Sequence, residues 1–196
     1  MAQWLNEFSG NGYSPYILLS GVAVIVLSIL VITVIIIARR NPNWQIKKRL
    51  KGLGAKIIKD VKLPDGVDGD INIDYLLLTD KGILVVDVNQ YDGLLYGNEE
   101  HEQWTQVVRR KNYVFKNPLR QMGLNLMAVK AVVPDAHVEG AVLFAGQARF
   151  PSRVPEGVLM LGDIPRQRSK ATIPENALLA WQQLDQFRRH YQIVDQ

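Results

Sequence analysis

One uncharged apolar run constrains this chain more than any other feature. Residues 17–38 comprise twenty-two residues without a charged side chain. A helix of that length extends about 33 Å at a rise of about 1.5 Å per residue, which is enough to cross a hydrocarbon core of about 30 Å. In lipid a helix is the single-segment structure that pairs every backbone amide, so the many β-branched residues do not argue against it. The run therefore predicts one transmembrane helix over residues 17–38.

Charge around this run predicts its orientation. Residues 1–38 carry only Glu7, whereas residues 39–62 have a net charge of +8. A cleaved signal peptide would need a basic start, a shorter apolar run and a small-residue cleavage site, and this N-terminus begins without Lys or Arg. The positive-inside rule then places the basic side in the cytoplasm. We expect a single-pass protein of a bacterial inner or plasma membrane, with an outward N-terminus (1–16), a basic juxtamembrane linker (39–54) and a cytoplasmic domain (55–192).

The basic segment has three interpretations: it sets the topology, it contacts anionic lipid, or it binds nucleic acid. Residues 63–196 have a net charge of −3, so the folded body is not that of a globally basic nucleic-acid binder. The chain has no cysteine, which excludes disulfides and thiolate metal sites. The candidate lipid or nucleic-acid contacts are Arg39, Arg40, Lys47, Lys48, Arg49 and Lys51.

Hydrophobic patterning after the linker predicts strands first and helices later. Asn117 and Pro118 suit the N-cap and first position of a helix over 117–133, and Asp92-Gly93 is a hairpin signal. This order predicts an α/β domain with a mixed central sheet and flanking helices. The expected strands are 55–63, 71–79, 83–91, 94–97, two around 109–112, 138–146 and 157–163, and the expected helices are 41–54, 117–133 and 172–192.

Two expected neighbouring strands each carry an Asp in an apolar setting. Asp74 interrupts the strand 71–79, and Asp87 follows an apolar run with Asn89 two residues later, on the same face. Two close buried carboxylates repel unless a cation or a proton intervenes. A hard divalent ion such as Mg²⁺ would resolve the conflict and could activate a water against a phosphodiester. The alternative is that one Asp pairs with a basic residue or a loop amide, or lies in water.

Taken together, these residues resemble the nuclease-related domain (NERD) family, which is assigned to the PD-(D/E)xK, restriction-endonuclease-like fold. The resemblance spans roughly residues 55–146 and depends on the order and spacing of its elements. Many relatives also carry an N-terminal membrane helix. The matching residues are Asp74, Lys81, Gly82, Tyr91, Gly93, Gly97, Trp104, Asn117, Pro118 and Gln121.

The resemblance implies that Asp74 and Asp87 are the metal-binding acids and that Asn89 stands where the family has its catalytic lysine. Asparagine can hydrogen-bond a water but carries no positive charge. Tyr75 replaces the usual histidine, and no acidic residue lies in the preceding helix. We therefore expect a degenerate nuclease fold, a pseudoenzyme, that binds nucleic acid or protein at the membrane. The alternatives are an active Mg²⁺-dependent nuclease and a small subunit of a membrane protein complex.

Overall fold

The computed structural model describes residues 20, 23–33, 42–66, 69–165 and 172–194. By internal contacts the chain divides into two units, residues 1–45 and 46–196. In the first unit, the described residues 23–33 are helical, and the large apolar side chains from Val24 to Ile32 are 48–63% exposed. Within the described ranges, no helix has the length and apolar character needed to cross a membrane. The predicted span 17–38 lies partly outside the described residues, and the transmembrane helix is not confirmed.

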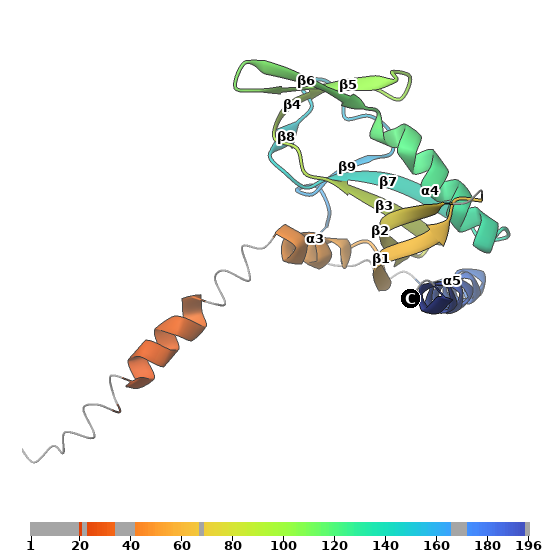
Figure 1. Cartoon of the computed structure of the whole chain (residues 1–196), viewed down its shortest axis with the longest axis horizontal. Helices are drawn as coiled ribbons and strands as arrows, with labels where there is room; N and C mark the ends of the chain where they lie inside the picture. Colours follow the sequence, from red (N-terminus) through yellow and green to blue (C-terminus); the bar gives the residue numbers. More distant parts are fainter. Residues whose placement is uncertain (1–19, 21–22, 34–41, 67–68, 166–171, 195–196) are drawn as a thin grey trace, which may run out of the picture. The chain divides into compact units, whose positions relative to one another are not determined.

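The second unit is built on a mixed five-stranded sheet, which confirms the predicted α/β class (Figure 1). Its order is β1-β2-β3-β7-β9, with antiparallel pairing from β1 to β3 and parallel pairing from β3 to β9. The strands are β1 (Lys56–Pro64), β2 (Asp70–Leu78), β3 (Ile83–Asn89), β7 (Val138–Phe144) and β9 (Val158–Met160).

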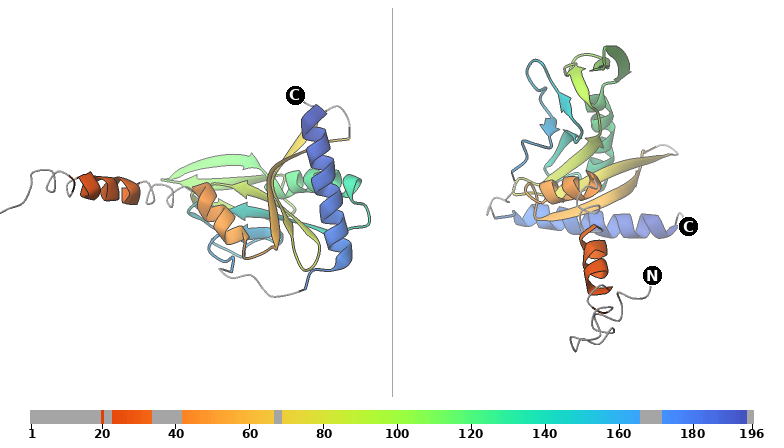
Figure 2. Two further views of the ribbon diagram at one scale, coloured as in Figure 1. Left: turned by 90° about the horizontal axis from the view of Figure 1, so that it is seen from below. Right: turned by 90° about the vertical axis from the view of Figure 1, so that its left-hand side faces the viewer.

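Helices cover both faces of this sheet. On one face lie α4 (Pro118–Val132) and α5 (Glu175–Val194); α5 packs on β1 and β2 and contacts α4 (Figure 2). The other face is covered by Ile46 and Leu50 of α3 (Pro42–Leu50), both fully buried. Asn117 caps α4 as predicted, its side chain accepting the Leu119 amide at 3.0 Å.

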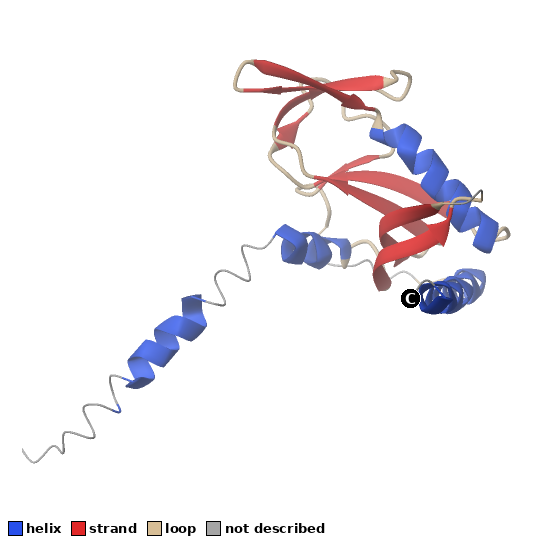
Figure 3. Cartoon of the chain, in the orientation of Figure 1, coloured by secondary structure: helices blue, strands red, loops and turns tan. Residues whose placement is uncertain are grey.

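A second, four-stranded sheet was not expected from the sequence. Its order is β6-β5-β4-β8, and it appears beside the first sheet in Figure 3. The predicted hairpin at Asp92-Gly93 is wrong, because both edges of β3 are occupied by β2 and β7 and the next strand pairs elsewhere. The strands are β4 (Gly93–Tyr96), β5 (Gln103–Val108), β6 (Lys111–Lys116) and β8 (Ala148–Arg149).

An aromatic cluster joins the two sheets. Trp104 of β5 is fully buried and stacks with Phe144 of β7 at 6.1 Å between ring centroids. Tyr91, in the link between β3 and β4, stacks on Phe115 of β6 at 4.5 Å. Phe150 packs edge-on against Trp104. The inner face of the four-stranded sheet therefore shares one core with the five-stranded sheet.

Candidate functional site

Asp74 and Asp87 lie where β2 and β3 separate. The antiparallel ladder between these strands runs from the turn to the pair Tyr75–Val86 and ends there. Asp74 and Asp87 are the next residues on the two strands, and both are half-buried. The expectation that the two acids are neighbours is thus met by strand pairing.

The Asp74 carboxylate bridges the opening between the strands. The Val88 amide of β3 donates to Asp74 Oδ2 at 2.7 Å, a hydrogen bond that replaces a missing backbone pair. On the other side of β2, the ladder with β1 pairs Lys59 with Tyr75 and omits Asp60, whose φ is +53°. This interruption on both sides leaves the Asp74 side chain free to turn toward β3.

Asp87 titrates unusually for a carboxylate. Burial, reinforced by the negative charge of Asp74, raises its pKa to about 6, against a smaller lowering effect from Asn125. A carboxylate in this position repels its neighbour when both are ionised. The pair therefore favours either a shared proton or a bound cation.

Asn125 of α4 is a site residue that the sequence analysis missed. Its side chain is 1% exposed and faces Asp87 closely enough to lower the pKa of that carboxyl. Among the residues that the structure describes, neither Oδ1 nor Nδ2 has a partner in hydrogen-bonding geometry. Burying an unsatisfied amide costs about 1–3 kcal/mol. The available signal was a polar residue within the apolar stripe formed by Met122, Leu126 and Val129.

The donor set fits a hard divalent cation. Asp74 from β2, Asp87 from β3 and Asn125 from α4 offer oxygen atoms, the ligands that Mg²⁺ and Mn²⁺ prefer. No group of three His, Cys, Asp or Glu side chains with metal-binding potential occurs among the described residues, so here the third donor would be an amide.

Asn89, in the position of the family lysine, is half-buried at the end of β3 on the same face as Asp87. Its backbone carbonyl accepts the Ala145 amide at 2.9 Å. On β1, Lys59 Nζ lies 2.9 Å from Asp60 Oδ2. This contact with Asp60 raises the pKa of Lys59, and the charges of Tyr75 and Asp74 raise it further.

Of the remaining basic candidates, the four that the structure describes lie in or beside α3. Lys47, Lys48 and Lys51 are exposed, whereas Arg49 is half-buried and donates from Nη1 to the Ile164 carbonyl at 2.9 Å. Arg49 therefore has a structural contact. Arg39 and Arg40 lie outside the described residues.

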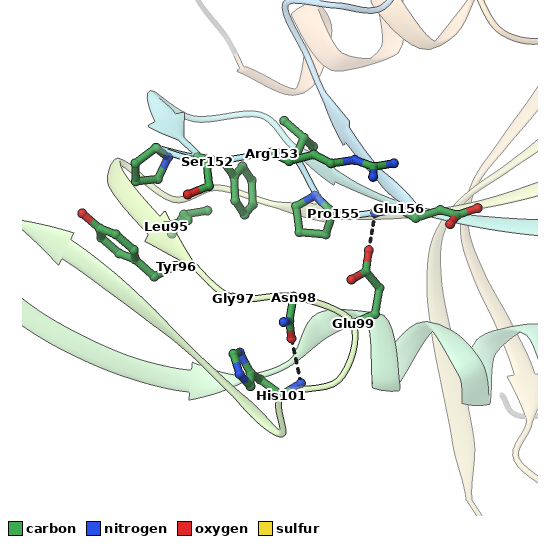
Figure 4. Close-up of a pocket in the computed structure, with 13 residues that line it drawn as sticks. Leu95, Tyr96, Gly97, Asn98, Glu99, His101, Ser152, Arg153, Pro155 and Glu156 are labelled. Atoms are coloured by element: carbon green, nitrogen blue, oxygen red, sulfur yellow. Dashed lines mark hydrogen bonds between the residues drawn. The ribbon is translucent and has the colours of Figure 1, made fainter.

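A hollow of about 640 Å³ lies elsewhere, between β4 and the segment 150–156 (Figure 4). The Glu99 carboxylate accepts the Glu156 amide across it. A hydrogen bond from the backbone of Glu99 itself, followed by the Glu156 amide, lowers the pKa of Glu99. The hollow contains neither of the paired aspartates nor Asn89 among its lining residues. Its walls include His101, Ser152 and Arg153.

Comparison with known proteins places this chain in a class of nuclease-related proteins. The chain belongs to the nuclease-related domain (NERD) family, which it matches over residues 39–145, more than half of its length. It is 24% identical over 119 residues to an uncharacterized protein of Bacillus anthracis. That match covers 56% of this chain and 56% of the relative, so the chain spans about half the length of the relative. No solved structure matches.

Proposed function

We propose that this protein is a membrane-tethered, nucleic-acid-binding module built on a nuclease fold, with little or no phosphodiester hydrolysis. The observation that carries the proposal is Asn89, which occupies the end of β3 beside Asp87. It supplies a hydrogen bond but no positive charge and no proton at neutral pH. Losing one preorganised electrostatic group of this kind typically costs two or more decades of rate.

The chain's own residues would still hold the polar centre together. Asp74 ties β2 to β3 through the Val88 amide, and Asp87 and Asn125 face each other across the sheet and α4. These three side chains would hold Mg²⁺, which supplies Lewis-acid polarisation of a phosphate when bound. Asn89 would orient a water molecule without assisting its deprotonation.

The apolar run supports the tether. Residues 17–38 are uncharged, and the described part exposes its large apolar side chains, as expected for a segment that contacts lipid. The basic residues after the run support a cytoplasmic domain at the inner or plasma membrane. The alternative for a membrane-tethered chain is a role as a small subunit of a membrane protein complex.

An active nuclease is a second candidate because the strand register places Lys59 of β1 opposite Tyr75, the residue after Asp74. Lysine there would supply the positive charge that Asn89 lacks. Its contact with Asp60 at 2.9 Å argues for a structural role first. Replacement of Lys59 by Met separates the two candidates, because only the second predicts a loss of cleavage.

The test uses the full chain in an uncharged detergent, incubated with single-stranded and plasmid DNA and with RNA, in Mg²⁺ or Mn²⁺. We expect salt-sensitive binding with cleavage near background, and metal-dependent cleavage on Asn89→Lys that disappears when Asp74→Asn is added. Efficient cleavage by the unaltered chain that Asp74→Asn abolishes would reject the proposal. An unaltered chain that binds no nucleic acid at low salt would reject it equally.

A further inference from the structure

The four-stranded sheet has an outer face that nothing covers in the described chain. Alternation places Leu95, Trp104 and Phe115 on the inner face, in the core. The opposite side chains form the outer face, in two cross-strand rows. One row is Tyr96, Thr105 and Val114, and the other is Arg149, Leu94, Val107 and Asn112.

The centre of this outer face is apolar and exposed. Val114 is 63% exposed, Tyr96 47% and Leu94 38%. An apolar centre within a polar rim is typical of a binding surface. In RNA-binding domains, aromatic side chains on the open face of a four-stranded sheet stack bases, and Tyr96 is the aromatic side chain on this face.

The rim of the outer face is basic along β6, β8 and the β5–β6 turn, whereas the β4–β5 loop carries Glu99, Glu100 and Glu102. Strands β4, β5, β6 and β8, with the turn between β5 and β6, contain no acidic residue. No ion pair in the described part of the chain involves their basic side chains. The nearest acid before β5, Glu102, pairs with Arg120 of α4 at 3.5 Å. The exposed basic residues on this face or in the turn are Arg109, Arg110, Lys116 and Arg149, whereas alternation places Lys111 on the inner side.

The β5–β6 turn retains two arginines against local preference. Val108 pairs with Lys111, so Arg109 and Arg110 form a two-residue turn, with φ of +47° and +66°. Two successive positive φ values define a type I′ turn, for which Asn-Gly is the favoured sequence. Strained positions held by residues with long charged side chains point to a functional requirement for those side chains.

We propose that the outer face and this turn bind a single-stranded nucleic acid. Bases stack on Tyr96 and the neighbouring aliphatic side chains, while Arg109, Arg110 and the other rim cations contact phosphates. Aromatic platforms combined with uncompensated cations are the chemistry of single-strand binding. The proposal rests on the proposed function for the kind of ligand, and it places binding on a surface separate from Asp74 and Asp87. A duplex hides its base faces and makes only the phosphate contacts.

The central experiment measures fluorescence anisotropy of a labelled oligothymidine of about 20 nucleotides with the full chain in uncharged detergent, over a range of salt. Arg109→Asn combined with Arg110→Gly removes two cations and installs the favoured turn, so the melting temperature is expected to hold or rise. Affinity is expected to fall roughly tenfold, and the slope of log K against log salt to decrease by about 1.4 for two lost single-strand phosphate contacts.

Tyr96→Leu tests stacking separately from charge. It keeps an apolar side chain and is expected to weaken binding roughly tenfold without changing the salt slope. The matched control is Lys62→Gln combined with Lys130→Gln, which removes two exposed cations from β1 and α4. That control is expected to change affinity by less than about twofold.

Other outcomes overturn the proposal. If both the turn variant and Tyr96→Leu bind like the unaltered chain, while Lys47→Gln with Lys51→Gln abolishes binding, the α3 segment is the binding surface. That result leaves the proposed function intact. If the turn variant instead loses binding to vesicles containing anionic lipid and keeps its affinity for the oligonucleotide, the outer face is a lipid contact. Equal affinity for duplex and single strand also contradicts the proposal.

Discussion

The five-stranded sheet is covered on both faces and yet contains a polar centre, whereas the four-stranded sheet leaves one face open and places apolar side chains on it. In the first, Asn125 is 1% exposed, and neither of its amide atoms has a hydrogen-bond partner in the described part of the chain. In the second, Val114 is 63% exposed in a face without acidic residues. The two regions depart from the usual distribution of polar and apolar groups in opposite directions. Buried polar groups suit a small ligand held by few atoms, and an open apolar face with a basic rim suits an extended one.

The largest expected effect is a difference in the free energy of unfolding between variants on the two faces of the four-stranded sheet. Trp104→Ala should lower the free energy of unfolding by about 3–5 kcal/mol, because the indole is fully buried between the sheets and donates to the Asn98 carbonyl at 2.9 Å. Tyr96→Ala, on the outer face, should cost less than about 0.5 kcal/mol. Urea unfolding measures both. Similar losses for the two variants would mean that the outer face is not open.

The next effect concerns charge in the polar centre. Because the pKa of Asp87 is raised to about 6 in the folded state, the folded protein binds a proton more tightly than the unfolded chain. Its contribution to stability is present below about pH 4 and is lost as the pH rises through about 6. Asp87→Asn should therefore stabilise the protein at pH 8 by an amount on the order of 2 kcal/mol and have little effect at pH 4.

Urea unfolding in EDTA at these two pH values checks this expectation, with Asp80→Asn in the exposed β2–β3 turn as the control. Asp80→Asn should leave unchanged the difference in the free energy of unfolding between pH 8 and pH 4. An Asp87→Asn variant that is destabilised equally at both would indicate that the carboxylate has a structural partner when ionised.

A smaller effect is expected for the amide of Asn125. Asn125→Leu, close to isosteric, should stabilise the protein by about 1–2 kcal/mol in EDTA, since it removes a buried unsatisfied polar group. It should also reduce the rise in melting temperature produced by MnCl₂. Asn125→Asp should do the reverse, lowering stability in EDTA and increasing the gain from Mn²⁺. Identical responses of the two variants to Mn²⁺ would remove Asn125 from the cation site.

The smallest effect concerns the β5–β6 turn. Arg109→Asn combined with Arg110→Gly should raise the free energy of unfolding by about 0.5–1 kcal/mol, because both positions have positive φ. Asn112 is the second residue of β6 and pairs with Val107. Asn112→Gly should therefore lower the free energy of unfolding by a similar amount, because glycine weakens a strand interior. Thermal unfolding measures both. A destabilised double variant would show that the arginines have structural contacts of their own.

Most of the five-stranded sheet could be predicted because its signals are local. Apolar runs bounded by turn residues predicted β1, β2 and β3, and Asn117-Pro118 predicted the start of α4. The neighbouring positions of Asp74 and Asp87 also followed from a short turn between adjacent strands. Each of these inferences required contacts only between segments close in sequence.

The errors arose where partners are distant in sequence. Asp92-Gly93 has the residues of a hairpin turn, but β7 occupies the free edge of β3, so β4 joins another sheet. Asn125 was overlooked because helical periodicity identifies a buried position and does not reveal that an acid lies opposite. The position of Lys59 opposite Tyr75 depends on the register of β1 with β2. The assignment of Asn89 to the position of the catalytic lysine depended on the family resemblance. Its consequence for catalysis stays a prediction.

The parallel pairing of β3 with β7 also sets an order of events during synthesis. β2 precedes β3 along the chain, but Ile83 pairs with Val138, so β3 has one unpaired edge until β4, β5, β6 and α4 have left the ribosome. Long-range parallel pairing is slow, and an apolar strand with an open edge is prone to associate with other chains. The proposed tether would hold the nascent chain at the membrane surface during that interval. Tethering would then protect assembly as well as localise the finished protein.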